Sequence, residues 1–241
     1  FLLGITQCLT EFFPISSSLH LKLVSDFFHI KQEPSFFLLC HLATSFSVLL
    51  YFRRDIFSLL KEKKNLFLYV FALLPLVIVY GIFGKSIKSL SDQFLGPFLI
   101  VTAFLLFFLK EKQEKPSTFS RKIGDVLFIG SMQSLALVPG LSRSATTIFA
   151  ATNRGWSMKQ AFCFSYLLSI PTIWGGCILE MRSISPTLLN FSTLLAGISA
   201  FIVGYLALIF VGFLIERKKF SYFGYYCLFL GILLTSYRIL G

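Results

Sequence analysis

Two polar runs decide how this apolar chain must fold: QCLTEFFPISSSLH at residues 7–20 and PGLSRSATT at residues 139–147. They place a carboxylate, an imidazole, a guanidinium and a cluster of hydroxyl groups in a chain of 241 residues that is 56% hydrophobic and 14% charged. Ionisable groups are costly inside a bilayer and therefore mark functional sites there. We expect the function of the chain to reside in these two runs.

The composition predicts an integral membrane protein, with a mean hydropathy of +0.79. Six apolar segments approach the ~20 residues that a helix needs to cross the bilayer core. They cover residues 36–52, 66–83, 94–109, 160–180, 191–215 and 221–240. The sequence therefore predicts an all-α, polytopic, multi-pass membrane protein with about six spanning helices. The chain starts at Phe1 inside an apolar run, so we expect residues to precede it.

The net charge of +11 is best explained by membrane orientation. Lysine and arginine crowd the predicted loops at residues 53–65, 110–122 and 216–219, whereas residues 84–93 hold only two lysines. The positive-inside rule places the first three loops in the cytoplasm and the fourth outside. The abundant phenylalanines lie in apolar runs and do not alternate with basic residues, so we expect no nucleic-acid partner.

This topology leaves residues 1–20 and 123–152 without a full crossing. We predict that each forms a re-entrant hairpin, the first entering from outside and the second from the cytoplasm. Pro14 and the pair Pro139-Gly140 supply the breaks. Non-helical backbone at that depth is tolerated only when it is buried in protein or lines a wet cavity.

A weak internal repeat supports two matching halves. The spacing Gly-x-x-Gln-x-Leu followed by Pro-x-x-Ser occurs twice, at Gly4, Gln7, Leu9, Pro14 and Ser17 and at Gly130, Gln133, Leu135, Pro139 and Ser142. Three predicted spans follow each copy, which turns the second copy upside down. We predict an inverted-topology repeat within one membrane domain, residues 1–241: a first repeat 1–115 with hairpin 1–20, and a second repeat 116–241 with hairpin 123–152.

The first run contains residue types that are typical of a catalytic site. Gln7 and Glu11 are spaced i, i+4 and share a helix face directly before Pro14. The serines at 16–18 favour a helix N-terminus, whose free N–H groups and positive dipole end attract anions. His20 follows closely enough to share a face with these serines.

The second run contains residue types that are typical of a phosphate-binding site. Ser142, Arg143 and Ser144 are predicted to open a helix, with Thr147 one turn further on. Helix-start N–H groups, hydroxyls and a guanidinium together bind phosphate groups well. Arg143 stays charged at every physiological pH, so its ligand is expected to be negative.

The sequence evidence for a metal site, and for a role of the two other histidines, is weaker. One expectation is a divalent cation, Mg²⁺ or Ca²⁺, bridging Glu11 and a bound diphosphate, because Mg²⁺ commonly uses few carboxylates and takes phosphate oxygens as further ligands. His29 and His41 have no comparable acid and hydroxyl neighbours in the sequence. We interpret them as packing or interfacial residues.

At these positions the chain resembles the bacterial undecaprenyl-diphosphate phosphatase family, known from bacitracin resistance. Three elements carry the resemblance: Glu/Gln-x-x-x-Glu at residues 7–11, Pro-x-Ser-Ser-x-x-His at 14–20 and Pro-Gly-x-Ser-Arg-Ser at 139–144. The resemblance implies a phosphoric anhydride hydrolase in the bacterial cytoplasmic membrane. It would remove the terminal phosphate of a polyprenyl diphosphate lipid and regenerate undecaprenyl phosphate for peptidoglycan synthesis. Its active site would open to the extracytoplasmic side.

The expected roles follow from the residue chemistry and this resemblance. The catalytic residues are predicted to be Glu11, Ser17, His20 and Arg143, and the substrate-binding residues Gln7, Ser16, Ser142, Ser144 and Thr147. Ser17 is the favoured nucleophile, deprotonated by His20, with Glu11 orienting the base or holding a metal ion; attack by His20 itself or by water stays open. The alternative is a transporter or flippase of an anionic lipid, which would have the same architecture. We make no prediction of the oligomeric state.

Overall fold

The computed structural model describes residues 2–30, 34–61, 63–88, 94–110, 122–180 and 191–240, and the secondary structure in these ranges is helical. The helices are α1 (Leu2–Phe12), α2 (Ser17–Phe27), α3 (Pro34–Tyr51), α4 (Arg53–Lys61), α5 (Lys63–Lys88), α6 (Leu95–Phe107), α7 (Ile123–Leu135), α8 (Arg143–Asn153), α9 (Met158–Glu180), α10 (Phe191–Glu216) and α11 (Tyr222–Leu240). The predicted all-α class is confirmed.

A helix forms at each of the six predicted spans, but the helices differ in length. Three are long and apolar enough to cross a membrane: Leu66–Ile87, Met158–Leu179 and Leu194–Glu216. A fourth span is possible if Phe36–Tyr51 is combined with α4, to which it is joined by a bend of 74°. Helices α6 and α11 are shorter apolar helices. The chain is a multi-pass membrane protein, and the count of six stays a prediction.

Each polar run lies at a break between two short helices. Helices α1 and α2 have 11 residues each and contact one another, as do α7 and α8, which have 13 and 11 residues. At a rise of ~1.5 Å per residue, none of these helices spans a bilayer core of ~30 Å. The breaks predicted at Pro14 and Pro139-Gly140 are confirmed. The second arm of the first hairpin, however, runs to Phe27, because apolar residues continue beyond the predicted end at residue 20.

Side chains from other helices bond the open backbone at both breaks. In the first break, the Tyr166 hydroxyl donates to the Phe12 carbonyl, and the Cys227 thiol lies 3.7 Å from the Pro14 carbonyl oxygen. In the second, the Thr102 hydroxyl lies 3.3 Å from the Gly140 carbonyl and accepts the Ser142 N–H at 3.1 Å. Buried backbone away from water needs such partners. Helices α6, α9 and α11 therefore hold the two breaks in place.

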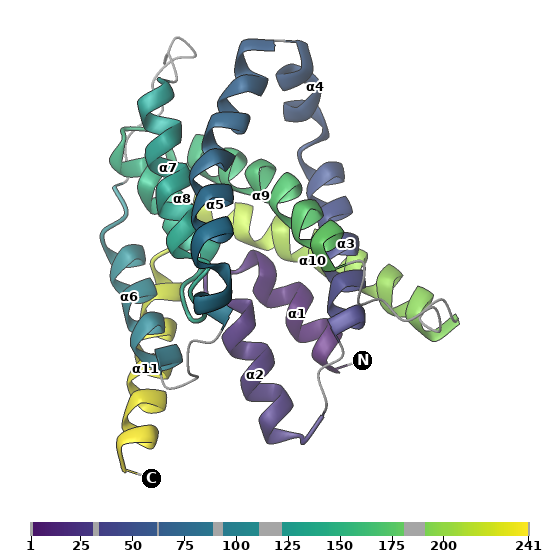
Figure 1. The fold of residues 1–241 in the computed structure, drawn as a ribbon, viewed down its shortest axis with the longest axis vertical. Coiled ribbons are helices and arrows are strands. Elements are labelled where there is room, and N and C mark those ends of the chain that lie inside the picture. The colour runs from purple at the N-terminus through teal and green to yellow at the C-terminus, as the bar shows by residue number, and fades with distance from the viewer. Residues whose placement is uncertain are drawn as a thin grey trace.

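Figure 1 shows the first arm of each hairpin beside a longer helix, α1 at α10 and α7 at α5. Helix α6 runs along α11. Helix α7 approaches α5 so closely that a Cβ atom at Gly130 would lie 2.1 Å from the Ala72 carbonyl oxygen, so only glycine fits there. In Figure 1, α4 stands at one end of the molecule, and the tip of α2 and the C-terminal end of α11 at the other.

The division into two repeats stays a prediction. Its predicted boundary, between residues 115 and 116, lies outside the described residues. The same holds for most of the basic loop at residues 110–122.

Candidate functional site

A pocket of about 250 Å³ opens between the two broken helix pairs. Both polar runs line it, together with α3. Its lining residues are Thr10, Glu11, Phe13, Ser16, Ser17, Ser18, His41, Ala136, Leu141, Ser142, Arg143 and Ser144. Six of the predicted site residues, which are far apart in the sequence, are thus brought together.

Glu11 is the centre of this pocket, and its two carboxylate oxygens have different partners. Oε1 accepts a hydrogen bond from Arg143 Nη2 at 2.9 Å, which joins the two hairpins. Oε2 accepts from Gln7 Nε2 at 2.9 Å and from Ser17 Oγ at 3.2 Å. The Glu11 side chain is 7% exposed and that of Arg143 19% exposed. A buried carboxylate needs such a partner, since the loss of one leaves an uncompensated charge.

The start of α8 presents hydrogen-bond donors to the pocket. Ser142 is the N-cap residue, and its Oγ accepts the Ala145 N–H at 3.4 Å. Ser142 Oγ and Ser144 Oγ lie 3.2 Å apart, and both serines are buried. The prediction that this run opens a helix is confirmed, and the arrangement favours an anion beside Arg143.

The start of α2 is built differently. Ser16 precedes the helix at φ 66°, a region that residues with a side chain rarely adopt, and its side chain caps no backbone N–H. Its Oγ lies 3.3 Å from Ser18 Oγ. Such a conformation costs ~1–3 kcal/mol and is typical of functional sites. It holds the Ser16 and Ser17 hydroxyls at the pocket wall.

His20 does not meet Ser17 as predicted. Its Nδ1 lies 2.8 Å from the Ser16 carbonyl oxygen and its Nε2 2.7 Å from the Tyr226 hydroxyl. A carbonyl only accepts, so Nδ1 carries a proton, and in the neutral imidazole Nε2 then accepts from the Tyr226 hydroxyl. Both ring nitrogens are therefore engaged, one by the backbone of the first break and the other by α11. The nearness in sequence that suggested a Ser17–His20 pair does not produce one.

His41 lies in the pocket, and its interpretation as a packing or interfacial residue is wrong. Its Nδ1 is 3.5 Å from Glu11 Oε2, and the Gln7 amide nitrogen lies 3.1 Å and 3.2 Å from its two ring nitrogens. The acid and hydroxyl neighbours that His41 lacks along the chain are supplied by α1 and α2. One sequence signal was present: an imidazole in the middle of an apolar helix is itself unusual.

Two predicted substrate-binding residues lie behind the pocket. Gln7 is fully buried and supports Glu11 and His41. The Thr147 hydroxyl lies 2.8 Å from the Arg143 carbonyl oxygen and 2.6 Å from Ser165 Oγ. Thr147 thus ties the first turn of α8 to α9 and does not face the pocket.

The residues here partly suit a hard cation. No group of three His, Cys, Asp or Glu side chains that could hold a metal ion occurs in the part of the chain that the structure describes. Glu11 supplies one carboxylate, and the buried Gln7 Oε1 has no hydrogen-bond partner among the described residues. Two oxygens of this kind suit Mg²⁺ when a substrate supplies the remaining ligands.

Comparison with known proteins gives consistent matches along the chain. The family model described as "Bacitracin resistance protein BacA" matches residues 1–233. A protein of Thermosipho africanus named undecaprenyl-diphosphatase is 36% identical over 96% of this chain and 96% of its own length. A protein of the same name from Protochlamydia amoebophila is 39% identical over 98% of this chain and 96% of its own length. A third protein of this name, from Methanococcus vannielii, is 34% identical over 98% of this chain and 98% of its own length.

Proposed function

The chain belongs to the bacitracin resistance protein BacA family, and from this premise we infer that it is an undecaprenyl-diphosphatase. It removes the terminal phosphate of undecaprenyl diphosphate. The resemblance and the enzyme class predicted from the sequence are thereby confirmed. The transporter alternative is not favoured, since these relatives carry the name of a hydrolase.

We propose that the pocket between the hairpins is the hydrolytic site. The observation that carries this proposal is the 2.9 Å contact between Arg143 and Glu11, which brings a phosphate-binding cation and a carboxylate into one pocket beside Ser17. Arg143 would bind the terminal phosphate, assisted by the Ser142 and Ser144 hydroxyls and the first N–H groups of α8. The prenyl tail would remain in lipid.

Ser17 is the proposed nucleophile, and Glu11 replaces His20 as its base. The Ser17 hydroxyl already donates to Glu11 Oε2 at 3.2 Å, so its proton can pass to that oxygen. As the Ser17 Oγ–phosphorus bond forms, the bond from phosphorus to the bridging oxygen breaks, and undecaprenyl phosphate leaves with that oxygen. Water then attacks the phosphoserine, releasing inorganic phosphate and restoring the Ser17 hydroxyl.

His41 is proposed to serve as the proton relay of Glu11. Its ring is 3.5 Å from the oxygen that receives the Ser17 proton, and its side chain is 35% exposed. It therefore has access to water, from which Glu11 is largely shielded. His20 keeps a supporting role, in which it links the start of α2 to Tyr226.

A divalent cation remains a proposal. Glu11 would hold it together with the diphosphate oxygens. When bound, it would neutralise negative charge on the diphosphate during transfer. Arg143 already supplies one positive charge at the same place.

The placement in the membrane extends the predicted topology. We propose a protein of the cytoplasmic membrane whose two hairpins are re-entrant and whose pocket opens to the extracytoplasmic side. The helix pairs α1 with α10 and α7 with α5 support an inverted repeat, since each pair joins the first arm of a hairpin to a long helix of the other half. The product would return to peptidoglycan synthesis as the lipid carrier.

Phosphate release tests the proposal. Purified protein is incubated with undecaprenyl diphosphate, and free phosphate is measured beside Arg143→Ala. We expect release from the wild type and a loss of ~10²–10³-fold or more in the variant, the usual effect of removing a group that stabilises transferring charge. No release by the wild type would contradict the function, and equal release by both would contradict the site.

A further inference from the structure

A second cavity, of about 500 Å³, lies beside the first turn of α4. It is formed by the bend between α3 and α4, the start of α9 and the end of α10. Its volume falls in the range of ~300–1,000 Å³ that is typical of small-molecule sites. It shares no lining residue with the hydrolytic pocket.

Aromatic side chains separate the two cavities. Phe52 and Phe162 line the second cavity, and behind them both rings pack on the buried Tyr166, with centroids 6.3 Å and 4.7 Å away. The Tyr166 hydroxyl in turn donates to the Phe12 carbonyl in the first break. The second cavity is therefore a site of its own.

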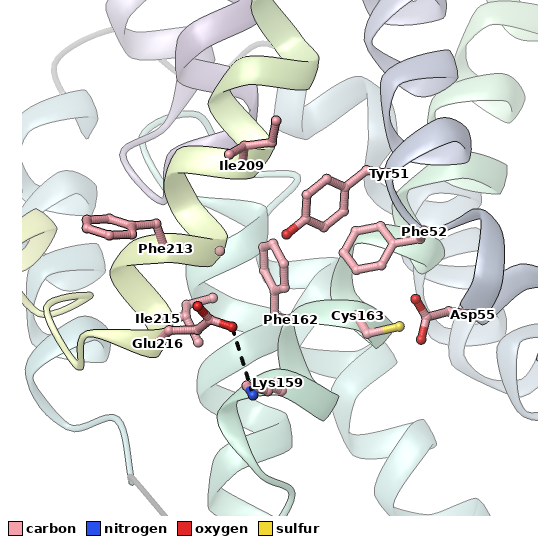
Figure 2. Close-up of a pocket in the computed structure, with 11 residues that line it drawn as sticks. Tyr51, Phe52, Asp55, Lys159, Phe162, Cys163, Ile209, Phe213, Ile215 and Glu216 are labelled. Atoms are coloured by element: carbon pink, nitrogen blue, oxygen red, sulfur yellow. Dashed lines mark ion pairs between the residues drawn. The ribbon is translucent and has the colours of Figure 1, made fainter.

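The charged side chains lie toward one end of this cavity. Figure 2 shows Asp55, Lys159 and Glu216 toward one end, Ile209 at the other, and the rings of Tyr51 and Phe162 between them. Basic residues follow directly, at 217–219 after α10 and at 53–54 in the first turn of α4. The positive-inside rule places such clusters at the cytoplasmic boundary of the membrane. A charged end at the boundary and an apolar end in the membrane suit an amphiphile.

The charged groups have both signs. Lys159 Nζ lies 4.0 Å from Glu216 Oε1, and Asp55 makes no ion pair within the described ranges. Carboxylates next to aromatic rings attract an ammonium group, and a lysine attracts a phosphate. One headgroup that carries both is phosphoethanolamine. Two carboxylates against one lysine disfavour a purely anionic headgroup.

Part of the cavity wall is open to lipid. Ile209 and Phe213 are 45% and 46% exposed on α10, whose central residues are predicted to lie in the membrane. An acyl chain lying against them would bury apolar surface that is otherwise exposed beside the cavity.

We propose that this cavity binds one zwitterionic phospholipid with a phosphoethanolamine headgroup. The ammonium contacts Asp55 and Glu216, the phosphate contacts Lys159, and an acyl chain lies along Ile209 and Phe213. The lipid would link α10 to the 74° bend after α3 and so stabilise the bend.

Native mass spectrometry of the full chain in detergent tests this proposal. The protein is titrated with phosphatidylethanolamine or with phosphatidylglycerol of the same acyl chains. We expect the protein to retain one phosphatidylethanolamine in preference to phosphatidylglycerol. Asp55→Asn and Glu216→Gln should each weaken binding of this lipid by about tenfold, which is the effect of losing one hydrogen bond to a charged group. These two side chains are exposed, so the variants should fold.

Two controls separate this site from others. Asp26→Asn removes an exposed carboxylate of α2, at the other end of the molecule, and should leave lipid retention unchanged. Glu11→Gln should also retain the lipid, because the hydrolytic pocket is separate. Equal retention of both lipids would overturn the proposal, and so would unchanged retention in Asp55→Asn and Glu216→Gln.

Discussion

In the proposed mechanism, Glu11 connects binding and chemistry through its two carboxylate oxygens. One oxygen holds Arg143 and so fixes the second hairpin, while the other accepts the Ser17 hydroxyl. Glu11→Gln keeps the size of the side chain but removes the charge and the base. We expect kcat to fall by ~10²–10⁴-fold, the usual contribution of general acid–base catalysis, with a smaller change in KM.

A matched control for Glu11→Gln is Asp125→Asn. The Asp125 side chain is also 7% exposed and also pairs with an arginine, Arg154, at 2.6 Å, but it lies outside the pocket. Loss of this pair should lower the melting temperature without a comparable loss of kcat. An equal loss of kcat in both variants would assign the effect of Glu11→Gln to stability alone.

The two histidines give a second prediction at the residue scale. His41→Gln keeps a hydrogen-bonding side chain but removes the proton relay, so kcat should fall by ~10²-fold or more. The pH dependence of kcat should change as well in His41→Gln. Tyr226→Phe, which frees His20 Nε2, should leave the pH profile of kcat close to that of the wild type. A pH profile altered by Tyr226→Phe and not by His41→Gln would return the catalytic role to His20.

These histidines also show how far the sequence can predict the site. Glu11, Ser17, Ser142, Arg143 and Ser144 could be identified because each stands in a polar run. The partners of His20 and His41 could not, since they depend on how α3 and α11 pack against the first hairpin. Neighbours along the chain suggested Ser17 as the partner of His20 and no partner for His41. Tertiary packing supplied Tyr226 for the first and Glu11 for the second.

At the scale of elements, the fixed breaks in the helices are what allow two short hairpins to form a site. Thr102 of α6 is fully buried and bonds both the Gly140 carbonyl and the Ser142 N–H. Thr102→Val keeps the shape and removes both bonds. We expect a loss of ~1–3 kcal/mol in stability, the cost of leaving a buried polar group without a partner, and weaker binding of the diphosphate.

Thermal unfolding measures the loss of stability in Thr102→Val, and KM measures its weaker binding of the diphosphate. Ser199→Ala is the control, because the hydrogen bond from Ser199 Oγ to the Leu195 carbonyl lies within α10 and is exposed. Unchanged stability and KM in Thr102→Val would show that the break holds its form without α6.

The elements themselves were partly predictable. Proline and glycine located both breaks, and Ser142 located the start of α8. The extension of α2 to Phe27 was missed, because the predicted hairpin was ended where the polar run ends and not where the helix ends. The partners of the breaks, Thr102, Tyr166 and Cys227, lie in apolar helices with no local signal of this role.

At the scale of the whole molecule, α4 and the tip of α2 should lie on opposite sides of the membrane. Ser58 in α4 and Ile30 after α2 are exposed, and four of the five native cysteines are buried. In intact cells, a maleimide that cannot cross the membrane should label Ile30→Cys and not Ser58→Cys. The reverse pattern would invert the predicted topology and place the pocket opening in the cytoplasm.

The central claim is that both hairpins form one hydrolytic site, and a double-mutant cycle tests it most directly. Phosphate release from undecaprenyl diphosphate is measured as kcat/KM for the wild type, Ser17→Ala, Arg143→Ala and the double variant. Residues that act as a unit are strongly non-additive, so the double variant should lose no more than about tenfold beyond the worse single variant. Two losses that multiply in the double variant would contradict a shared site.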